Sequence, residues 1–193
     1  MTVSNDGKFL YIVDGSDEVT RFQIDSQGQL QSPTVVAQGL NPISMIFAPS
    51  GHYAYVLNYD ATMSQFAFND TDGSLTALTP ASVSSMTCPT GPMERKTTQD
   101  GHQVIYVLSC VMDQVEVLKI GTDGTLSSLQ LVSTGPVPEG MTVADLPETI
   151  TVDAKGRAAF VLDFNVGEMI RFSVSEDGSL AVSYTHLTLP TKA

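Results

Sequence analysis

The sequence predicts an all-β protein, a β-propeller of about four four-stranded blades. A stretch that begins and ends with a turn glycine occurs four times, and its two glycines are always 21 to 23 residues apart. Successive copies lie 44, 50 and 55 residues apart, measured between their first glycines. A core of nearly constant length with variable spacers is typical of stacked structural repeats. The first glycines are Gly7, Gly51, Gly101 and Gly156, and the second ones are Gly28, Gly73, Gly124 and Gly178.

The hydrophobic pattern within each copy predicts four short strands. In the first copy an Asn-Asp-Gly turn precedes a run of β-formers, and residues 18–24 alternate polar and apolar side chains as a half-buried strand does. No segment has the period of a helix, and strands grouped in fours indicate propeller blades rather than a sandwich. We expect blades at about residues 1–40, 41–80, 91–133 and 147–181. The expected strands are 2–4, 9–13, 18–24 and one from 30; 43–48, 54–57, 64–69 and 75–78; 96–98, 104–108, 115–120 and 126–132; 149–152, 158–162, 169–174 and one from 180.

The spacers between blades grow along the chain. From the second glycine of one copy to the first glycine of the next there are 23, 28 and then 32 residues. The additional residues therefore fall in the crossover from an outer strand to the next inner strand, and binding residues concentrate on such loops. We expect residues 80–95 and 135–148 to be the long crossover loops.

Composition excludes several kinds of partner. The formal net charge is −12 with only nine Lys and Arg residues, and nucleic-acid binding relies on clustered basic side chains. No apolar run approaches the roughly 18 residues of a membrane span, so we expect none. No cofactor or metal site is predicted: residues 69–73 look like a calcium loop but lack its distal glutamate, and a hairpin turn with Asx hydrogen bonds is favoured. Cys88 and Cys110 fit no metal or redox spacing, and either a disulfide or two semi-buried thiols remain open.

The repeats resemble the YVTN-type and lactonase-type β-propeller families, the latter including 6-phosphogluconolactonase. The resemblance covers residues 1–181 and is carried by Asn5–Val13, by the Gly-Leu-Asn-Pro sequence at 39–42 and by the Asp-Gly-x-Leu turns. It implies a seven-bladed ring, of which four blades would form an open arc. It also implies a cytoplasmic location for a lactonase and an extracytoplasmic one for a YVTN-type binding propeller.

A proline stands nine residues before the repeat glycine in three copies, at Pro42, Pro92 and Pro147, where we expect the inner strands to begin. The resemblance implies Pro-Arg-His at this place in some blades of a lactonase, where the charged and imidazole groups bind phosphate and act as general base. This sequence has Pro-Ile-Ser, Pro-Met-Glu and Pro-Glu-Thr instead, so no catalytic residue is assigned. The candidate ligand-binding residues at the channel mouth are Ser44, Glu94, Arg95 and Glu148.

Two interpretations of the charged residues Glu94, Arg95 and Lys96 stay open. They form either a mixed-charge cluster at the channel mouth, with Glu148 across from it, or a set of solvated loop charges. His52 and His102 directly follow a repeat glycine, at a place where the other copies have Lys or Arg, and we expect exposed turn positions without a catalytic role. Tyr11, Tyr55 and Tyr106 share one position, which Phe160 takes in the fourth copy, and we expect them to pack between sheets.

Two functions remain open at this point. The first is a non-catalytic propeller that holds a small molecule, such as a sugar lactone or a phosphate-sugar, or a protein partner. The second is a lactone hydrolase of the 6-phosphogluconolactonase type, with its catalytic groups in blades outside this sequence. Pro-Arg-His sequences in those blades would favour the hydrolase.

The end of the sequence calls for separate treatment. The ten amino acids at 182–191 are those that the DNA of a transposase-type sequencing-library adaptor encodes, one codon after another. We therefore expect residues 182–193, including His186, to be a tail that belongs to no domain and forms no strand completing the fourth blade.

Overall fold

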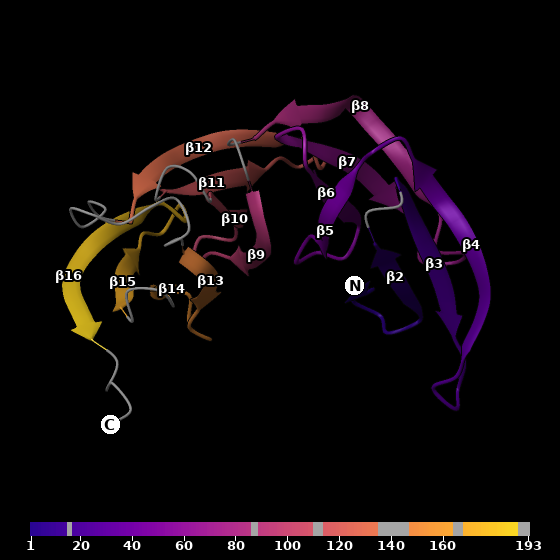
Figure 1. The fold of residues 1–193 in the computed structure, drawn as a ribbon, viewed down its shortest axis with the longest axis horizontal. Coiled ribbons are helices and arrows are strands. Elements are labelled where there is room, and N and C mark those ends of the chain that lie inside the picture. The colour runs from indigo at the N-terminus through magenta and orange to yellow at the C-terminus, as the bar shows by residue number, and fades with distance from the viewer. Residues whose placement is uncertain (15–16, 86–88, 110–113, 135–146, 164–167, 189–193) are drawn as a thin grey trace. The chain divides into compact units, whose positions relative to one another are not determined.

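The described chain is all-β and consists of four antiparallel sheets with four strands each (Figure 1). In each sheet the strands follow one another in chain order, as in a propeller blade. The predicted fold class is therefore confirmed. None of the described residues forms a helix that could cross a membrane. The computed structural model describes residues 1–14, 17–85, 89–109, 114–134, 147–163 and 168–188.

The strands of the four sheets have the following bounds. The first sheet holds β1 (Thr2–Val3), β2 (Phe9–Val13), β3 (Glu18–Ile24) and β4 (Leu30–Gln38). The second holds β5 (Pro42–Phe47), β6 (Tyr53–Asn58), β7 (Thr62–Phe68) and β8 (Leu75–Ser84). The third holds β9 (Pro89–Thr97), β10 (Gln103–Ser109), β11 (Gln114–Ile120) and β12 (Leu126–Ser133). The fourth holds β13 (Pro147–Val152), β14 (Ala158–Asp163), β15 (Glu168–Val174) and β16 (Leu180–Thr188).

The crossover from the second to the third sheet differs from the prediction. Much of the expected loop at residues 80–95 is strand, because β8 continues to Ser84 and β9 already begins at Pro89. The structure pairs Ser109 with Pro89, whereas Pro42 pairs with Asn58 and Pro147 with Asp163 at the corresponding places. Pro92 therefore lies inside its strand and does not begin it. A shift of register between Met93 and Pro89 accommodates the additional residues. Cys88, Cys110 and residues 135–146 lie outside the described residues.

The expectation for the end of the chain was wrong in one respect. Residues 182–188 belong to β16, which pairs with β15 through Phe172 and Val182, Arg171 and Ser183, and Met169 and Leu187. An outer strand is joined through its backbone, so that any stretch of β-formers next to an unpaired strand edge can fill the place. That these residues derive from an adaptor stays a prediction.

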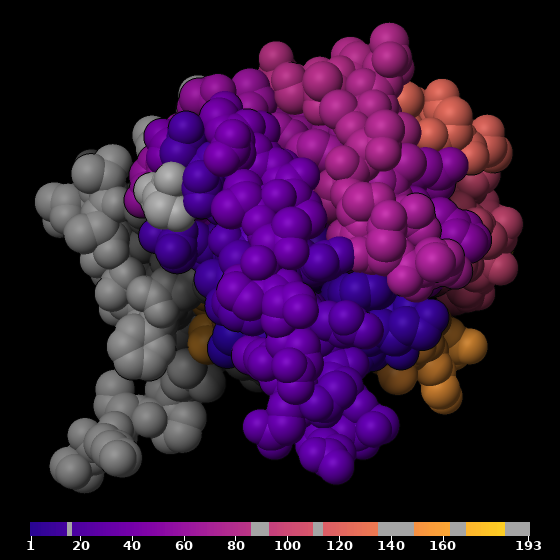
Figure 2. All heavy atoms as spheres, turned by 90° about the vertical axis from the view of Figure 1, so that its right-hand side faces the viewer, coloured from indigo at the N-terminus to yellow at the C-terminus, as the bar shows by residue number. Residues whose placement is uncertain are grey.

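The chain divides into two compact units. The first comprises Met1–Ser85 with Ile120–Leu126, and the second comprises Met86–Lys119 with Ser127–Ala193. In the first unit the outer strands β4 and β8 lie on the face that Figure 2 shows, and most of their residues are exposed. The core beneath is aromatic: the rings of Phe47 and Phe68 lie 5.0 Å apart and those of Tyr11 and Phe47 lie 5.4 Å apart, both edge to face.

The core of the second unit is mainly aliphatic. It consists of Val104, Tyr106, Leu108, Val115, Val117, Ile150, Ala159, Val161, Phe172 and Leu180. These residues come from β10, β11, β13, β14, β15 and the start of β16, so that one core joins the third and the fourth sheet. Each unit therefore has a hydrophobic core of its own.

Three tyrosines make the same hydrogen bond. The hydroxyl groups of Tyr11, Tyr55 and Tyr106 donate to the carbonyl oxygens of Gly73, Gly124 and Gly178, over 2.6, 2.7 and 2.9 Å. Each tyrosine is fully buried, and each glycine lies in the turn between the third and the fourth strand of a blade. The expected packing of these tyrosines is confirmed, and the hydroxyl also satisfies a backbone carbonyl.

Aspartates fix the conformation of the hairpin turns. In the turn that resembles a calcium loop, Asn69 Oδ1 accepts the N–H of Thr71 and Asp72 Oδ1 accepts the N–H of Ser74, both over 2.9 Å. These two bonds confirm the hairpin turn with Asx hydrogen bonds. The bonds from Ser74 lower the pKa of Asp72.

We predict that Tyr55→Phe lowers the free energy of unfolding by about 1–3 kcal/mol, because the change leaves the buried carbonyl of Gly124 without its donor. Urea unfolding followed by circular dichroism measures the effect. Tyr59→Phe is the matched control, since Tyr59 is 69% exposed, and it should leave the stability unchanged. Equal stability of the two variants would show that the hydroxyl contributes nothing.

We predict that Gly73→Ala is more destabilising than Gly28→Ala by about 1–3 kcal/mol. Both glycines lie in the third turn of their blade at nearly the same positive φ, 72° and 77°. A Cβ atom at position 73 would lie 2.8 Å from Cδ1 of Phe9, whereas one at position 28 meets nothing within 4 Å. Both variants carry the same backbone strain. The difference between their stabilities in thermal unfolding therefore measures the cost of the steric contact between the turn and the core. Equal losses would refute this explanation.

Candidate functional site

The candidate residues of the channel mouth lie on three first strands. Ser44 is half-buried on β5, where it pairs with Leu57. Glu94 and Arg95 are half-buried on β9, and Glu148 is on β13, with its side chain outside the described residues. Ser44 belongs to the first unit and the other three to the second. A common site formed by all four therefore remains a prediction.

Glu94 and Arg95 occupy opposite faces of their sheet. Glu94 pairs with Tyr106 and Arg95 with Ile105, and successive residues of a strand alternate between faces. The backbone N–H of Arg95 donates to Oε1 of Glu94 over 3.0 Å. Burial lowers the pKa of the Arg95 guanidinium, and the charge of Glu94 acts in the opposite direction. The side chains of Glu94 and Arg95 therefore place their charges on opposite faces of a partly buried strand and do not form one cluster.

Lys96 has a structural partner. Its Nζ donates to the carbonyl oxygens of Asp153 and Ala154, over 3.1 and 2.9 Å, in the turn between β13 and β14. Asn5 does the same in the first unit, where its Nδ2 donates to the carbonyls of Ala48 and Pro49 over 3.0 and 3.2 Å. Lys96 is therefore a residue that fixes the neighbouring turn, which neither interpretation of the charged stretch had foreseen.

The two histidines lie in hairpin turns, as predicted. His52 is exposed in the turn between β5 and β6. His102 lies in the turn between β9 and β10 but is half-buried rather than exposed, with its Nε2 3.2 Å from Oδ2 of Asp100. Neither residue lies on a first strand.

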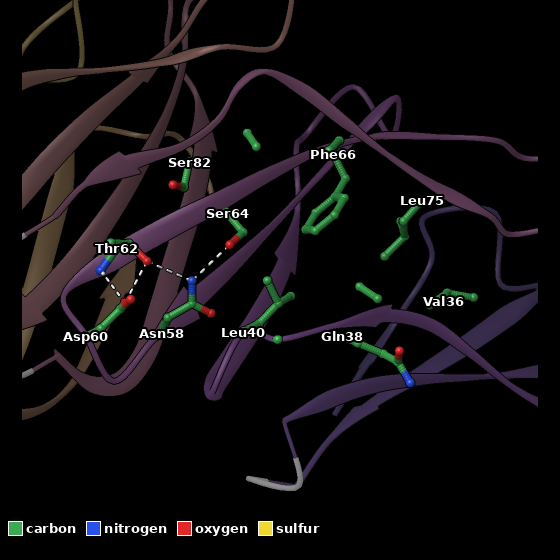
Figure 3. A pocket seen from close by; sticks show the side chains of 14 residues that line it. Val36, Gln38, Leu40, Asn58, Asp60, Thr62, Ser64, Phe66, Leu75 and Ser82 are labelled. Carbon is green, nitrogen blue, oxygen red and sulfur yellow. Dashed lines mark hydrogen bonds between the residues drawn. The ribbon is translucent and has the colours of Figure 1, made fainter.

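The first unit contains an open pocket of about 420 Å³ (Figure 3). We call it the crossover pocket, because part of its wall is the crossover from β4 to β5. The rest of the wall comes from the end of β4, the end of β6 with the turn after it, β7 and β8. Its lining consists of Val36, Ala37, Gln38, Gly39, Leu40, Asn58, Asp60, Thr62, Ser64, Phe66, Leu75, Ala77, Ala81 and Ser82.

Asn58 is the central polar residue of this pocket. It is 2% exposed, and its Nδ2 donates to Oγ1 of Thr62 and Oγ of Ser64, both over 2.9 Å. Thr62 Oγ1 donates its single proton to Oδ1 of Asp60 over 2.6 Å. Because Thr62 can then only accept from Asn58, the amide group must present its NH₂ to Thr62. This orientation leaves Oδ1 of Asn58 buried and without a hydrogen-bond partner among the described residues.

The crossover pocket lies at the end of the second blade where its inner strand begins. Asn58 pairs with Pro42, the first residue of β5, and the N–H of Tyr59 donates to the carbonyl of Asn41 over 3.1 Å. Sequence reasoning did not find this pocket. One signal was present: the residue three after the repeated aromatic is polar in every copy, as Asp14, Asn58, Ser109 and Asp163.

Comparisons with known proteins agree with this architecture. The family model described as lactonase, 7-bladed beta-propeller matches residues 1–94. A search of curated protein sequences found no match.

Several solved structures share the fold. The periplasmic gluconolactonase PpgL of Pseudomonas aeruginosa is 21% identical, with a TM-score of 0.73 over 93% of this chain and 54% of that chain. A protein from Lactobacillus plantarum is 20% identical, with a TM-score of 0.74 over 98% and 55%. A putative 6-phosphogluconolactonase from Bacteroides fragilis is 20% identical, with a TM-score of 0.73 over 97% and 54%. This chain therefore spans about half the length of these structures.

The family model covers the first two blades and β9 as far as Glu94. The remaining described residues repeat the same four-stranded unit, with Tyr106 bonded to Gly178 in the third blade and Phe160 at the tyrosine position in the fourth. The described chain therefore has the fold of a β-propeller, and its residues 1–94 match the lactonase family of seven-bladed propellers.

Proposed function

We propose that this protein is a ligand-binding β-propeller of the lactonase type, which holds a small molecule where the crossover enters the second blade. The observation that carries the proposal is the buried Oδ1 of Asn58, an acceptor without a partner among the described residues at the wall of an open pocket. A buried acceptor that forms no hydrogen bond costs about 1–3 kcal/mol. A ligand donor that reaches it removes that cost.

The lining of the crossover pocket supports binding rather than hydrolysis. Among the described lining residues there is no His, Lys, Cys or Glu to act as a base or nucleophile. The one carboxylate, Asp60, accepts two hydrogen bonds from Thr62, from its N–H over 3.1 Å and from its hydroxyl over 2.6 Å. Both bonds go to the same oxygen, Oδ1, so this carboxylate already fixes the turn at the start of β7.

The second candidate function is the hydrolysis of a sugar lactone or phosphate-sugar lactone. The match of residues 1–94 to the lactonase family favours it. Water attack on a lactone carbonyl needs a general base, and Glu94 is the half-buried carboxylate on a described inner strand that we propose for that role.

A ligand screen tests the first candidate. We expect ligand-observed NMR on the full chain to find small molecules that bind, and Ala81→Trp to abolish their signals by filling the pocket from an exposed lining position. Thr76→Trp is the matched control, because Thr76 is exposed on the same strand and does not line the pocket. Signals that survive Ala81→Trp would place binding elsewhere and refute this assignment.

An activity assay decides between the candidates. We expect the protein to hydrolyse gluconolactone and its 6-phosphate at the spontaneous rate, measured as acid release at constant pH. Hydrolysis above that rate which Glu94→Gln abolishes would favour the lactonase instead. Folding of the variant is checked by circular dichroism.

A further inference from the structure

We propose that the crossover pocket binds a small organic cation, a primary ammonium group attached to an apolar group. This inference rests on the proposed function and specifies the ligand class. It follows from three features of the pocket: the hydrogen-bonding character of its polar groups, their charge, and the composition of the opposite wall.

The polar groups of the pocket require a donor. Oδ1 of Asn58 is a buried acceptor without a partner among the described residues. The hydroxyl oxygens of Thr62 and Ser64 each receive a hydrogen bond from Nδ2 of the same amide. An ammonium group carries three donors and no acceptor, and therefore complements an unpaired carbonyl oxygen beside hydroxyl oxygens.

The charge at the pocket favours a cation. Asp60 lies at the exposed rim, and the described part of the chain shows no ion pair of its carboxylate. No Lys, Arg or His occurs among the described lining residues. An anionic ligand would therefore meet only like charge, whereas a cation gains attraction at an intermediate dielectric constant. The net charge of −12 acts in the same direction over longer distances.

The opposite wall requires an apolar group. Phe66, Leu75 and Val36 line the pocket away from Asn58, and Leu40 lies beside Asn58 (Figure 3). A polyol has hydroxyl groups on all sides, and those against this wall would lose their hydrogen bonds to water without replacement. An alkyl or aryl amine places its apolar part there and its charge on the polar side.

The ligand must open a short path to Asn58. Oδ1 is closed off from solvent in this structure and lies on the side of Leu40, which is half-buried (Figure 3). An ammonium group bonds to Oδ1 once the Leu40 side chain has changed its rotamer. The volume of about 420 Å³ lies within the usual range for small-ligand pockets, and benzylamine is a suitable probe.

The test is a titration of the full chain with four probes, followed by NMR: benzylamine, benzyl alcohol, benzoate and myo-inositol. We expect benzylamine to bind with a dissociation constant on the order of millimolar, more tightly than the other three. Asp60→Asn should weaken benzylamine about two- to tenfold and leave benzyl alcohol unchanged, because it removes the charge and keeps an acceptor for Thr62. Asp70→Asn, an equal change of charge outside the lining, should have no effect.

The possible results separate the inference from the proposed function. If benzyl alcohol or myo-inositol binds as tightly as benzylamine and loses its signals in Ala81→Trp, the inference that the ligand is an organic cation is refuted. The proposal that the pocket binds a small molecule is then supported. If no probe binds, and the screen finds no ligand that Ala81→Trp displaces, both are overturned. Benzylamine that binds equally to the Asp60→Asn and Asp70→Asn variants also refutes the inference.

Discussion

The hydrogen bond from a buried tyrosine to a glycine carbonyl is the interaction on which the blades depend. A phenol group that is fully buried needs a partner for its hydroxyl, and a turn carbonyl supplies one at 2.6 to 2.9 Å in three places. The turn approaches closely only because its residue is glycine: at position 73 a Cβ would lie 2.8 Å from Phe9. The tyrosine donates and the glycine accepts the same hydrogen bond, which explains why both residues recur at fixed places in the repeat.

This dependence also explains how much of the fold the sequence predicts. Turn glycines with positive φ, such as Gly7 and Gly51, are constrained by local sterics, and β2 and β6 after them by local hydrophobicity, so these strands were found within a residue. The end of β8 was missed, since it was predicted at residue 78 and lies at Ser84. The extent of β9 was missed because its prolines indicate a loop. β9 is the edge strand of its sheet, however, where a residue without an N–H is tolerated. The pairing of β16 was missed because residues 182–191 were interpreted as adaptor-derived, although the backbone alone can join such residues to β15.

The candidate site was predictable to a smaller extent. The alternation of a strand already implies that Glu94 and Arg95 face opposite sides, and this could have been derived from the sequence. The crossover pocket could not, because its wall combines the end of β4, a turn after β6 and two parts of β8. The unpaired oxygen of Asn58 depends on an additional fact, that Thr62 gives its only proton to Asp60. A network of this kind is visible only when three side chains are placed together.

Within β6, the residues that maintain the fold and those that line the pocket are separate. Tyr55 holds the outer turn at Gly124, and Asn58, three residues later, lines the pocket at the end of the strand. The other copies keep an aromatic residue at the first place and carry Asp14, Ser109 or Asp163 at the second. Because the packing between sheets is fixed by the first position, the second can change its charge and hydrogen bonding with little effect on the blade. A propeller built this way can present a different polar group at the end of each blade while the packing between its sheets stays constant.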